Sequence, residues 1–190
     1  MQGLINRSLQ SYLVDTYGPE LWAALAEELA LPEDEPDPAS AEAGIFDRLA
    51  AAAARRLDLP LPLLLEEYGL YLHGLARVRR LVRLCAETFE EFLCFISDMP
   101  DRVRMALPGL AMPGLDVALM PDGEVRIDVL GPPMQAHVLC GFLRGVSDDF
   151  GALSLVTAGD NGTLAVRLVD PDFGKARSFS LALPPARDAA

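Results

Sequence analysis

The chain has 190 residues, of which 51% are hydrophobic, and it carries a formal net charge of −12. This length and composition are typical of one folded domain with a sizeable core, and they exclude a disordered chain. No apolar run reaches the roughly 18–20 residues that span a bilayer, so we expect no membrane association. The negative charge would repel phosphate backbones, so nucleic-acid binding is not expected either.

The cysteines and the N-terminus indicate the compartment. Cys85, Cys94 and Cys140 are odd in number and widely spaced, which fits neither a disulfide framework nor a zinc motif. The first residues start directly on a helical pattern and lack the segments of a signal peptide. We therefore expect a cytoplasmic protein. The sequence also lacks a phosphate-binding loop, a metal-spaced cluster and a nucleophile elbow, so we expect no enzyme activity.

Apolar residues recur at helical spacing through the first two thirds of the chain. Tyr17-Gly18-Pro19 ends a first helix and begins a second one. A third helix is expected from about Ala39 to Leu57, and a helical region from about Leu63 to Leu84. The last region contains Gly69 and Gly74. Each glycine costs a helix roughly 1 kcal/mol relative to alanine, so both indicate close packing or a bend.

After Pro108 the spacing of apolar residues changes from helical to alternating. Leu115–Leu119 and Val125–Val129 predict a hairpin around a Pro-Asp-Gly turn. A helix is expected from about Met134 to Phe150. Further strands are expected at Leu153–Thr157, Thr163–Val169 and Ser178–Leu183. The fold class is therefore α+β, with a helical N-terminal part and a small antiparallel sheet crossed by one helix.

Five segments, in chain order, carry a resemblance to a known family. They are Met1–Asn6, Leu65–Tyr71, Thr88–Leu93, Leu107-Pro108 with Pro113, and Gly141–Gly145. In this order they resemble the N-terminal start, a central aromatic-glycine segment, the segment before the heme-ligating helix, the proline-bearing loop that distorts heme, and the late helix of the heme-nitric-oxide/oxygen-binding (H-NOX) family. The ordered set spans nearly the whole chain.

The resemblance implies a fold and a role. It implies a single H-NOX-like domain over residues 1–185, helical to about residue 107 and built on a sheet from about residue 113, with a tail at 186–190. Members of the family sense NO or O₂ and act on other signalling proteins. The resemblance therefore implies a standalone sensor domain whose partner is a signalling protein such as a histidine kinase or a diguanylate cyclase.

The family's chemistry depends on a proximal histidine, in a pattern like F-L-x-x-L-D-x-L-H. A single imidazole on the heme iron leaves the opposite position free for NO or O₂. The matching segment here places Pro100 at the histidine position, and proline has no donor atom for iron. Because proline is unfavourable inside a helix, a new helix is expected to begin here, with Asp98 or Met99 as its cap.

A second family motif, Tyr-x-Ser-x-Arg, binds the heme propionates through charge-assisted hydrogen bonds. Counting back from Gly141, the three positions are Asp128, Leu130 and Pro132. None of these residues suits a carboxylate, and Asp128 would repel one. Two independent losses predict that the chain has lost conventional heme binding. We therefore expect no cofactor, or heme if the family function is retained.

The sequence offers other side chains as replacement ligands. Cys94 and Met99 lie near the lost position, and thiolate and thioether both bind heme iron, so either is an alternative axial ligand. His73 is expected to be partly buried and hydrogen-bonded, and His137 to lie at the surface or to cap a helix. Two further cysteines are expected in the core, namely Cys85 and Cys140.

Charged residues of two helices are expected on solvated faces. They are the cluster Arg77, Arg79, Arg80 and Arg83, and the carboxylate pairs Glu66-Glu67 and Glu90-Glu91. For the arginine cluster, a docking patch for an acidic partner surface is the alternative. Nothing beside the carboxylate pairs indicates acid–base catalysis.

Three functions follow from the sequence. The chain is a heme-free sensor that signals through a protein partner, a heme-binding gas sensor with a non-standard axial ligand, or a binder of another apolar small molecule. Periodicity and the resemblance predict the walls of any retained pocket at Leu4, Ile5, Leu75, Val78, Phe95, Leu110, Met112, Leu115 and Leu143.

Overall fold

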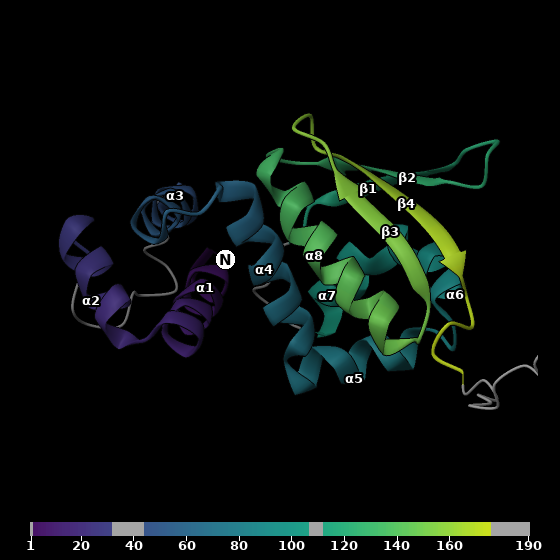
Figure 1. Cartoon of the computed structure of the whole chain (residues 1–190), viewed down its shortest axis with the longest axis horizontal. Coiled ribbons are helices and arrows are strands. Elements are labelled where there is room, and N and C mark those ends of the chain that lie inside the picture. Colours follow the sequence, from purple (N-terminus) through teal and green to yellow (C-terminus); the bar gives the residue numbers. More distant parts are fainter. Residues whose placement is uncertain (1, 32–43, 107–111, 176–190) are drawn as a thin grey trace, which may run out of the picture.

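The computed structural model describes residues 2–31, 44–106 and 112–175, which form a helical part followed by an antiparallel sheet (Figure 1). The helices are α1 (Gln2–Tyr17), α2 (Pro19–Glu28), α3 (Ile45–Leu57), α4 (Leu61–Gly74), α5 (Ala76–Cys85), α6 (Phe89–Phe95), the 3-10 helix η1 (Ile96–Asp98), α7 (Met99–Ala106) and α8 (Met134–Asp149). The strands are β1 (Gly114–Leu119), β2 (Val125–Leu130), β3 (Leu153–Ala158) and β4 (Thr163–Asp170). The predicted α+β class is confirmed.

The helix boundaries follow local backbone chemistry. Gly18 has φ +94°, a conformation that glycine adopts readily, and Pro19 stands in the first turn of α2. The helical region expected up to Leu84 is divided, because Leu75 is extended (φ −64°, ψ 123°) between α4 and α5. The bend that Gly74 indicated is therefore present. None of the described helices is long and apolar enough to cross a membrane.

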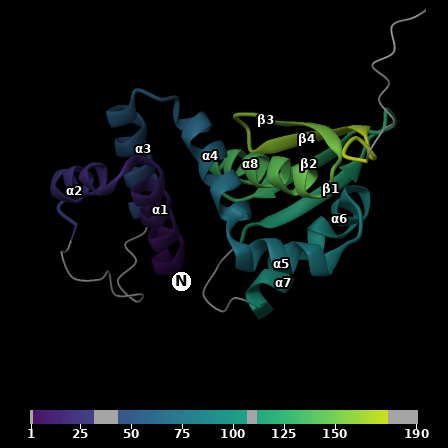
Figure 2. The ribbon, with the colours of Figure 1, turned by 60° about the horizontal axis from the view of Figure 1, so that its bottom comes forward.

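The sheet has the strand order β1-β2-β4-β3, and all of its pairs are antiparallel. The predicted hairpin is present, with Leu115 opposite Val129 and Gly123 at φ +83° in the turn. Helix α8 connects β2 to β3 and covers one face of the sheet (Figure 2). The strand expected at Ser178–Leu183 and the residues before Gly44 in the predicted third helix lie outside the described residues.

Two separate groups of buried side chains hold the fold together. The first, the bundle core, lies between α1, α2, α3 and α4, and includes Leu9, Leu49 and Leu64. The second, the sheet core, lies between the sheet and helices α5 to α8, and includes Phe92, Ile127 and Leu143, with η1 packed among them. Figure 1 shows α1, α2 and α3 on one side of α4 and the sheet on the other. Helix α4 and its partner α8 therefore join the two cores.

Helices α4 and α8 touch backbone to backbone, and glycine makes this contact feasible. A Cβ atom on Gly69 would overlap the carbonyl oxygen of Val138 on α8, and one on Gly141 would overlap the carbonyl oxygen of Glu66 on α4. At Gly145, an added Cβ would lie only 2.6 Å from Nδ1 of His73. We call this contact the α4–α8 seam. The close packing that Gly69 indicated is confirmed.

We expect Gly141→Ala to lower the free energy of unfolding by about 1–3 kcal/mol or more, because the backbones of α4 and α8 must move apart to admit the added methyl group. Gly74→Ala is the matched control. An added Cβ there meets nothing within 4 Å, so we expect it to raise stability by up to about 1 kcal/mol. Urea denaturation followed by circular dichroism measures both. Equal effects of the two substitutions would contradict the role of the seam.

Candidate functional site

The segment around the predicted histidine position, Pro100, is well organised. The side chain of Thr88 caps α6 by accepting the N–H of Glu91 at 3.1 Å, and the Glu91 carboxylate accepts the N–H of Glu87 at 2.8 Å. Helix α6 then gives way to η1, and α7 begins at Met99. Pro100 consequently occupies the first turn of α7, where its missing N–H costs little. The predicted start of a new helix at this place is confirmed.

Packing closes this segment against the sheet. Pro100 is buried, and η1 lies against β1. Ile96 and Met99 belong to the sheet core with exposed fractions of 1% and 7%, in the same cluster as Leu115 and Val129. The predicted position of the family's axial ligand, Pro100, therefore lies within a segment that packs on the sheet.

The two alternative axial ligands differ in their surroundings. Cys94, on α6, is exposed, whereas Met99 is buried in the sheet core. Cys140 is buried as expected, its thiol lies 3.5 Å from the carbonyl oxygen of Val156, and burial raises its pKa to about 11. Cys85 is half-buried against the sheet core, as expected. Of the two candidates, Met99 has the more enclosed sulfur.

The predicted propionate positions lie at the end of β2. Asp128 and Leu130 alternate with buried Ile127 and Val129, so they project from the sheet face opposite the core. Asp128 accepts a hydrogen bond of 2.6 Å from the Thr163 hydroxyl. Its Oδ1 lies 3.5 Å from Nε of Arg126.

The remaining residues of this region are apolar. Leu130 is 66% exposed and lies opposite Gly114, and Pro132 is exposed. Pro113 is half-buried, next to Gly131. None of the three predicted propionate side chains can donate a hydrogen bond to a carboxylate, so these three positions lack the chemistry of the family motif.

His73 is buried at one end of the α4–α8 seam. Its Nε2 lies 3.2 Å from Oδ2 of Asp149, a distance that fits an ion pair, although Nε2 has no aligned hydrogen bond. Burial lowers the pKa of His73. The hydrogen bond from Arg79, on α5, is the main reason that the pKa of Asp149 is lowered. Arg83 donates to the carbonyl oxygen of Asp149, and its guanidinium lies 5.1 Å from the ring centroid of Phe150.

His137 and Glu66 correct two expectations. His137 is 8% exposed and thus buried, not at the surface, because its α8 position faces α4. Its Nδ1 lies 3.5 Å from Oε1 of Glu66, and Arg144 donates to Oε2 at 2.6 Å. Arg144 also donates to the carbonyl oxygen of Val156 at 2.9 Å. Glu66 is therefore not on a solvated face, since it ties α4 to α8 and, through Arg144, to β3.

Glu67 also has a structural role. It accepts hydrogen bonds from the hydroxyls of Tyr17 at 2.7 Å and Tyr12 at 3.1 Å. Sequence reasoning missed both carboxylates because their partners lie 50 to 78 positions away along the chain. By contrast, Glu90 and Glu91 are exposed as expected.

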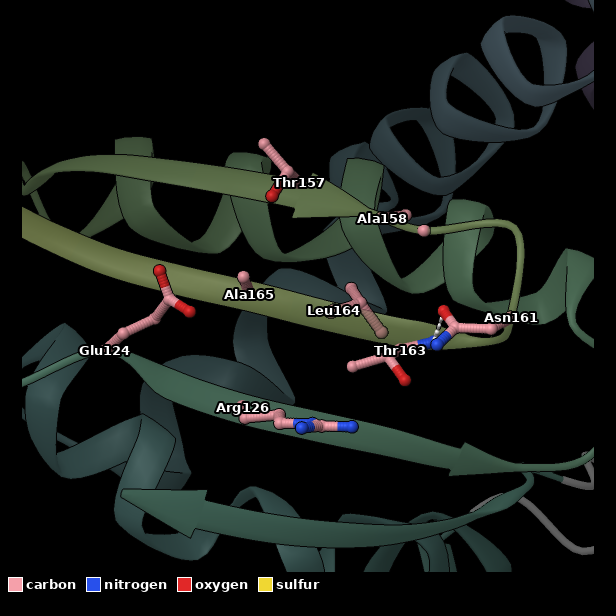
Figure 3. A pocket seen from close by; sticks show the side chains of 9 residues that line it. Glu124, Arg126, Thr157, Ala158, Asn161, Thr163, Leu164 and Ala165 are labelled. Atoms are coloured by element: carbon pink, nitrogen blue, oxygen red, sulfur yellow. Dashed lines mark hydrogen bonds between the residues drawn. The ribbon is translucent and has the colours of Figure 1, made fainter. Parts of the chain in front are cut away.

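The described residues line at least two surface pockets. The larger of these, of about 400 Å³, is on the sheet face opposite α8 (Figure 3); it is lined by Glu124, Arg126, Thr157, Ala158, Gly159, Asn161, Thr163, Leu164 and Ala165. The smaller, of about 140 Å³, is lined by Leu61, Pro62, Leu65, Pro133, Met134, His137 and Asp160. Pockets for drug-sized ligands span roughly 300–1,000 Å³, so the smaller one cannot take a tetrapyrrole. Neither pocket contains a predicted site residue.

The predicted pocket walls do not gather around either space. Leu115 and Leu143 are buried in the sheet core, with Val78 and Met112 half-buried against it, whereas Leu75 and Phe95 are exposed. The side chains of Leu4, Ile5 and Leu110 lie outside the described part. The described residues also contain no group of three or more histidine, cysteine, aspartate or glutamate side chains that could hold a metal ion.

The burial of His73 predicts a pH dependence of stability. It lowers the pKa of His73 in the folded chain below the ordinary value of about 6.5, so the unfolded chain takes up the proton first as the pH falls. We therefore expect stability to decrease as the pH is lowered through about 6.5, the ordinary pKa that His73 takes in the unfolded chain. In His73→Gln this part of the slope should disappear. Thermal melts across this range measure it, and an unchanged slope would contradict the assignment.

The comparisons with known proteins agree with this fold. A family model described as Haem-NO-binding (HNOB) matches residues 2–151, and no curated protein matches the chain. A triple mutant of an H-NOX protein from S. oneidensis in the Fe(II) state has a TM-score of 0.74 and 20% identity, covering 93% of this chain and 100% of its own.

Two further structures are similar. An unliganded Fe(II) H-NOX mutant from K. algicida has a TM-score of 0.70 and 16% identity, covering 90% of this chain and 96% of its own. An oxygen-binding H-NOX domain related to soluble guanylate cyclases has a TM-score of 0.65 and 13% identity, covering 94% of this chain and 100% of its own. At such identities, these likenesses establish the fold.

Proposed function

The chain belongs to the haem-NO-binding (H-NOX) family, and we propose that it is a member that lacks conventionally bound heme and signals through a protein partner. The family is one of sensor domains, and heme is its cofactor. The observation that carries the proposal is Pro100, a buried residue without a donor atom at the position that matches the family's iron ligand. Heme needs protein partners for its iron and for its propionates, so the residues at both predicted positions bear on the proposal.

The residues present do not fit heme in the family manner. Iron needs a nitrogen, sulfur or oxygen donor, and Pro100 offers none. Propionates need hydrogen-bond donors or cations, and Asp128, Leu130 and Pro132 offer none. Both histidines stand in the α4–α8 seam beside carboxylates, with His73 next to Asp149 and His137 next to Glu66.

Packing supports the same proposal. Ile96 and Met99 are almost fully buried in the sheet core, where η1 packs against β1. A protein that keeps its fold without the cofactor needs another source of cohesion, and here the α4–α8 seam joins the two cores directly. The signalling function that we propose then depends on a surface that binds the partner. Because the family's members act on signalling proteins, a histidine kinase or a diguanylate cyclase is the kind of partner we propose.

One observation favours a second candidate, a heme gas sensor with methionine ligation. Met99 is buried next to Pro100, and thioethers bind heme iron. A histidine-to-glycine mutant of an H-NOX domain from Shewanella oneidensis, with a TM-score of 0.67 and 21% identity, is described in the Fe(II)CO ligation state. One histidine can thus be replaced in a related domain that still holds iron.

An absorption spectrum separates the two candidates. We expect the protein, expressed with ample heme or titrated with hemin and then desalted to remove free hemin, to show no Soret band and no hemin-dependent rise in melting temperature, because no donor is placed for the iron. A Soret band with a rise in melting temperature would overturn the proposal. If a band appears, Met99→Leu and Cys94→Ser identify the ligand, since only the variant that lacks the ligand should lose it.

A gain-of-function variant serves as the positive control. Pro100→His supplies an imidazole at the family's position on α7. A Soret band in this variant, together with none in the parent chain, would show that the assay detects heme and that the donor was the limiting feature. Circular dichroism of both proteins checks that the substitution leaves the helical content unchanged.

A further inference from the structure

We propose that the outer face of α5 is the docking surface for an acidic segment of the protein partner. The surface, which we call the α5 stripe, consists of Arg77, Arg80 and Leu84. The inference rests on the proposed function in one respect, namely that the chain acts through a protein partner. It adds where that partner binds and which chemistry it presents.

The inner side of α5 and two of its arginines are already engaged. Val82 is buried in the sheet core, and Val78 and Cys85 pack against it. Arg79 and Arg83 bind Asp149 at the end of α8. All four arginines are exposed, as expected for a solvated helix face, and two of them, Arg79 and Arg83, also fasten α5 to α8.

The α5 stripe remains without a partner among the described residues. Positions 77, 80 and 84 share one face of a helix because they are three and four residues apart. Arg77 and Arg80 are exposed, and neither forms an ion pair or hydrogen bond within the described part of the chain. Leu84, at the end of the same stripe, is 78% exposed. Figure 2 shows α5 at the outside of the molecule, beside α7.

The charge of this surface indicates the occupant. The chain as a whole carries a formal net charge of −12, so neighbouring cationic side chains without carboxylate partners form a local exception. Two exposed guanidinium groups one helical turn apart bind carboxylates well, and a leucine beside them offers apolar contact. These features match an acidic segment with interspersed apolar residues.

The net charge also disfavours other occupants. An anionic membrane is an extended surface, so it also meets the excess of negative charge that surrounds the two arginines in a chain of net charge −12. Two copies of the chain repel each other for the same reason. A short acidic peptide segment meets only the local field within about 10 Å. A protein partner that presents such a segment is therefore the occupant we propose.

The test uses a fluorescein-labelled helical peptide whose exposed face consists of glutamate and leucine, with fluorescence anisotropy as the readout. We expect salt-sensitive binding to the full chain, weakened at least about tenfold in Arg77→Glu/Arg80→Glu because the charge is reversed. Leu84→Ala should weaken binding about three- to tenfold. Arg55→Glu/Arg56→Glu is the matched control, because it changes the charge equally on exposed arginines of α3 and should bind as the parent chain does.

Each outcome decides the inference. Absence of peptide binding, or equal loss in the two double variants, overturns it. Arginine-dependent binding to phosphatidylserine vesicles in preference to the peptide also overturns it and assigns the stripe to a membrane. The absorption spectrum of the same preparation is recorded separately. A Soret band would sink the heme-free function while leaving peptide binding intact, and lost peptide binding without a Soret band would sink only the α5 stripe.

Discussion

The backbone contact between α4 and α8 is the constraint on which the rest of this structure depends. Gly69 and Gly141 bring the two helices so close that a single methyl group would overlap carbonyl oxygens. Helix α4 carries part of the bundle core and α8 part of the sheet core. Because the two cores meet through this one contact, its geometry sets how the helical part and the sheet are placed relative to each other.

The same seam explains where the polar chemistry of the molecule is located. His73 and His137 lie along it, each beside a carboxylate, and Arg144 extends one of these pairs to the backbone of β3. Each imidazole is buried with a ring nitrogen within 3.5 Å of a carboxylate oxygen, so both histidines take part in the packing of the seam. Histidine is the side chain best suited to hold a metal. Both histidines are thereby engaged in the seam and not at Pro100, which lies in the first turn of α7.

The sequence predicted local structure well and distant pairings poorly. The Pro-Asp-Gly hairpin, the helix from Met134 and the break at Gly18 all depend on neighbours in the chain, and the structure confirms them. The family resemblance, carried by ordered motifs, is confirmed too. The partners of Glu66 and the burial of His137 were missed, because helical periodicity shows which residues share a face but not which helix covers it. The site residues at Pro100 and at the end of β2 rest on an ungapped count and stay predictions.

Loss of a cofactor site usually removes cohesion, because ligands that bind only the folded state stabilise it. In the heme-free protein that we propose, the cohesion comes from elsewhere. The α4–α8 seam joins the cores through backbone contact, Arg79 and Arg83 fasten α5 to the end of α8, and η1 packs directly on β1. None of these interactions involves the position of the axial ligand or of the propionates. A fold held in this way can lose its iron donor and still present α5 in a fixed orientation, which is what a surface that acts on a partner requires.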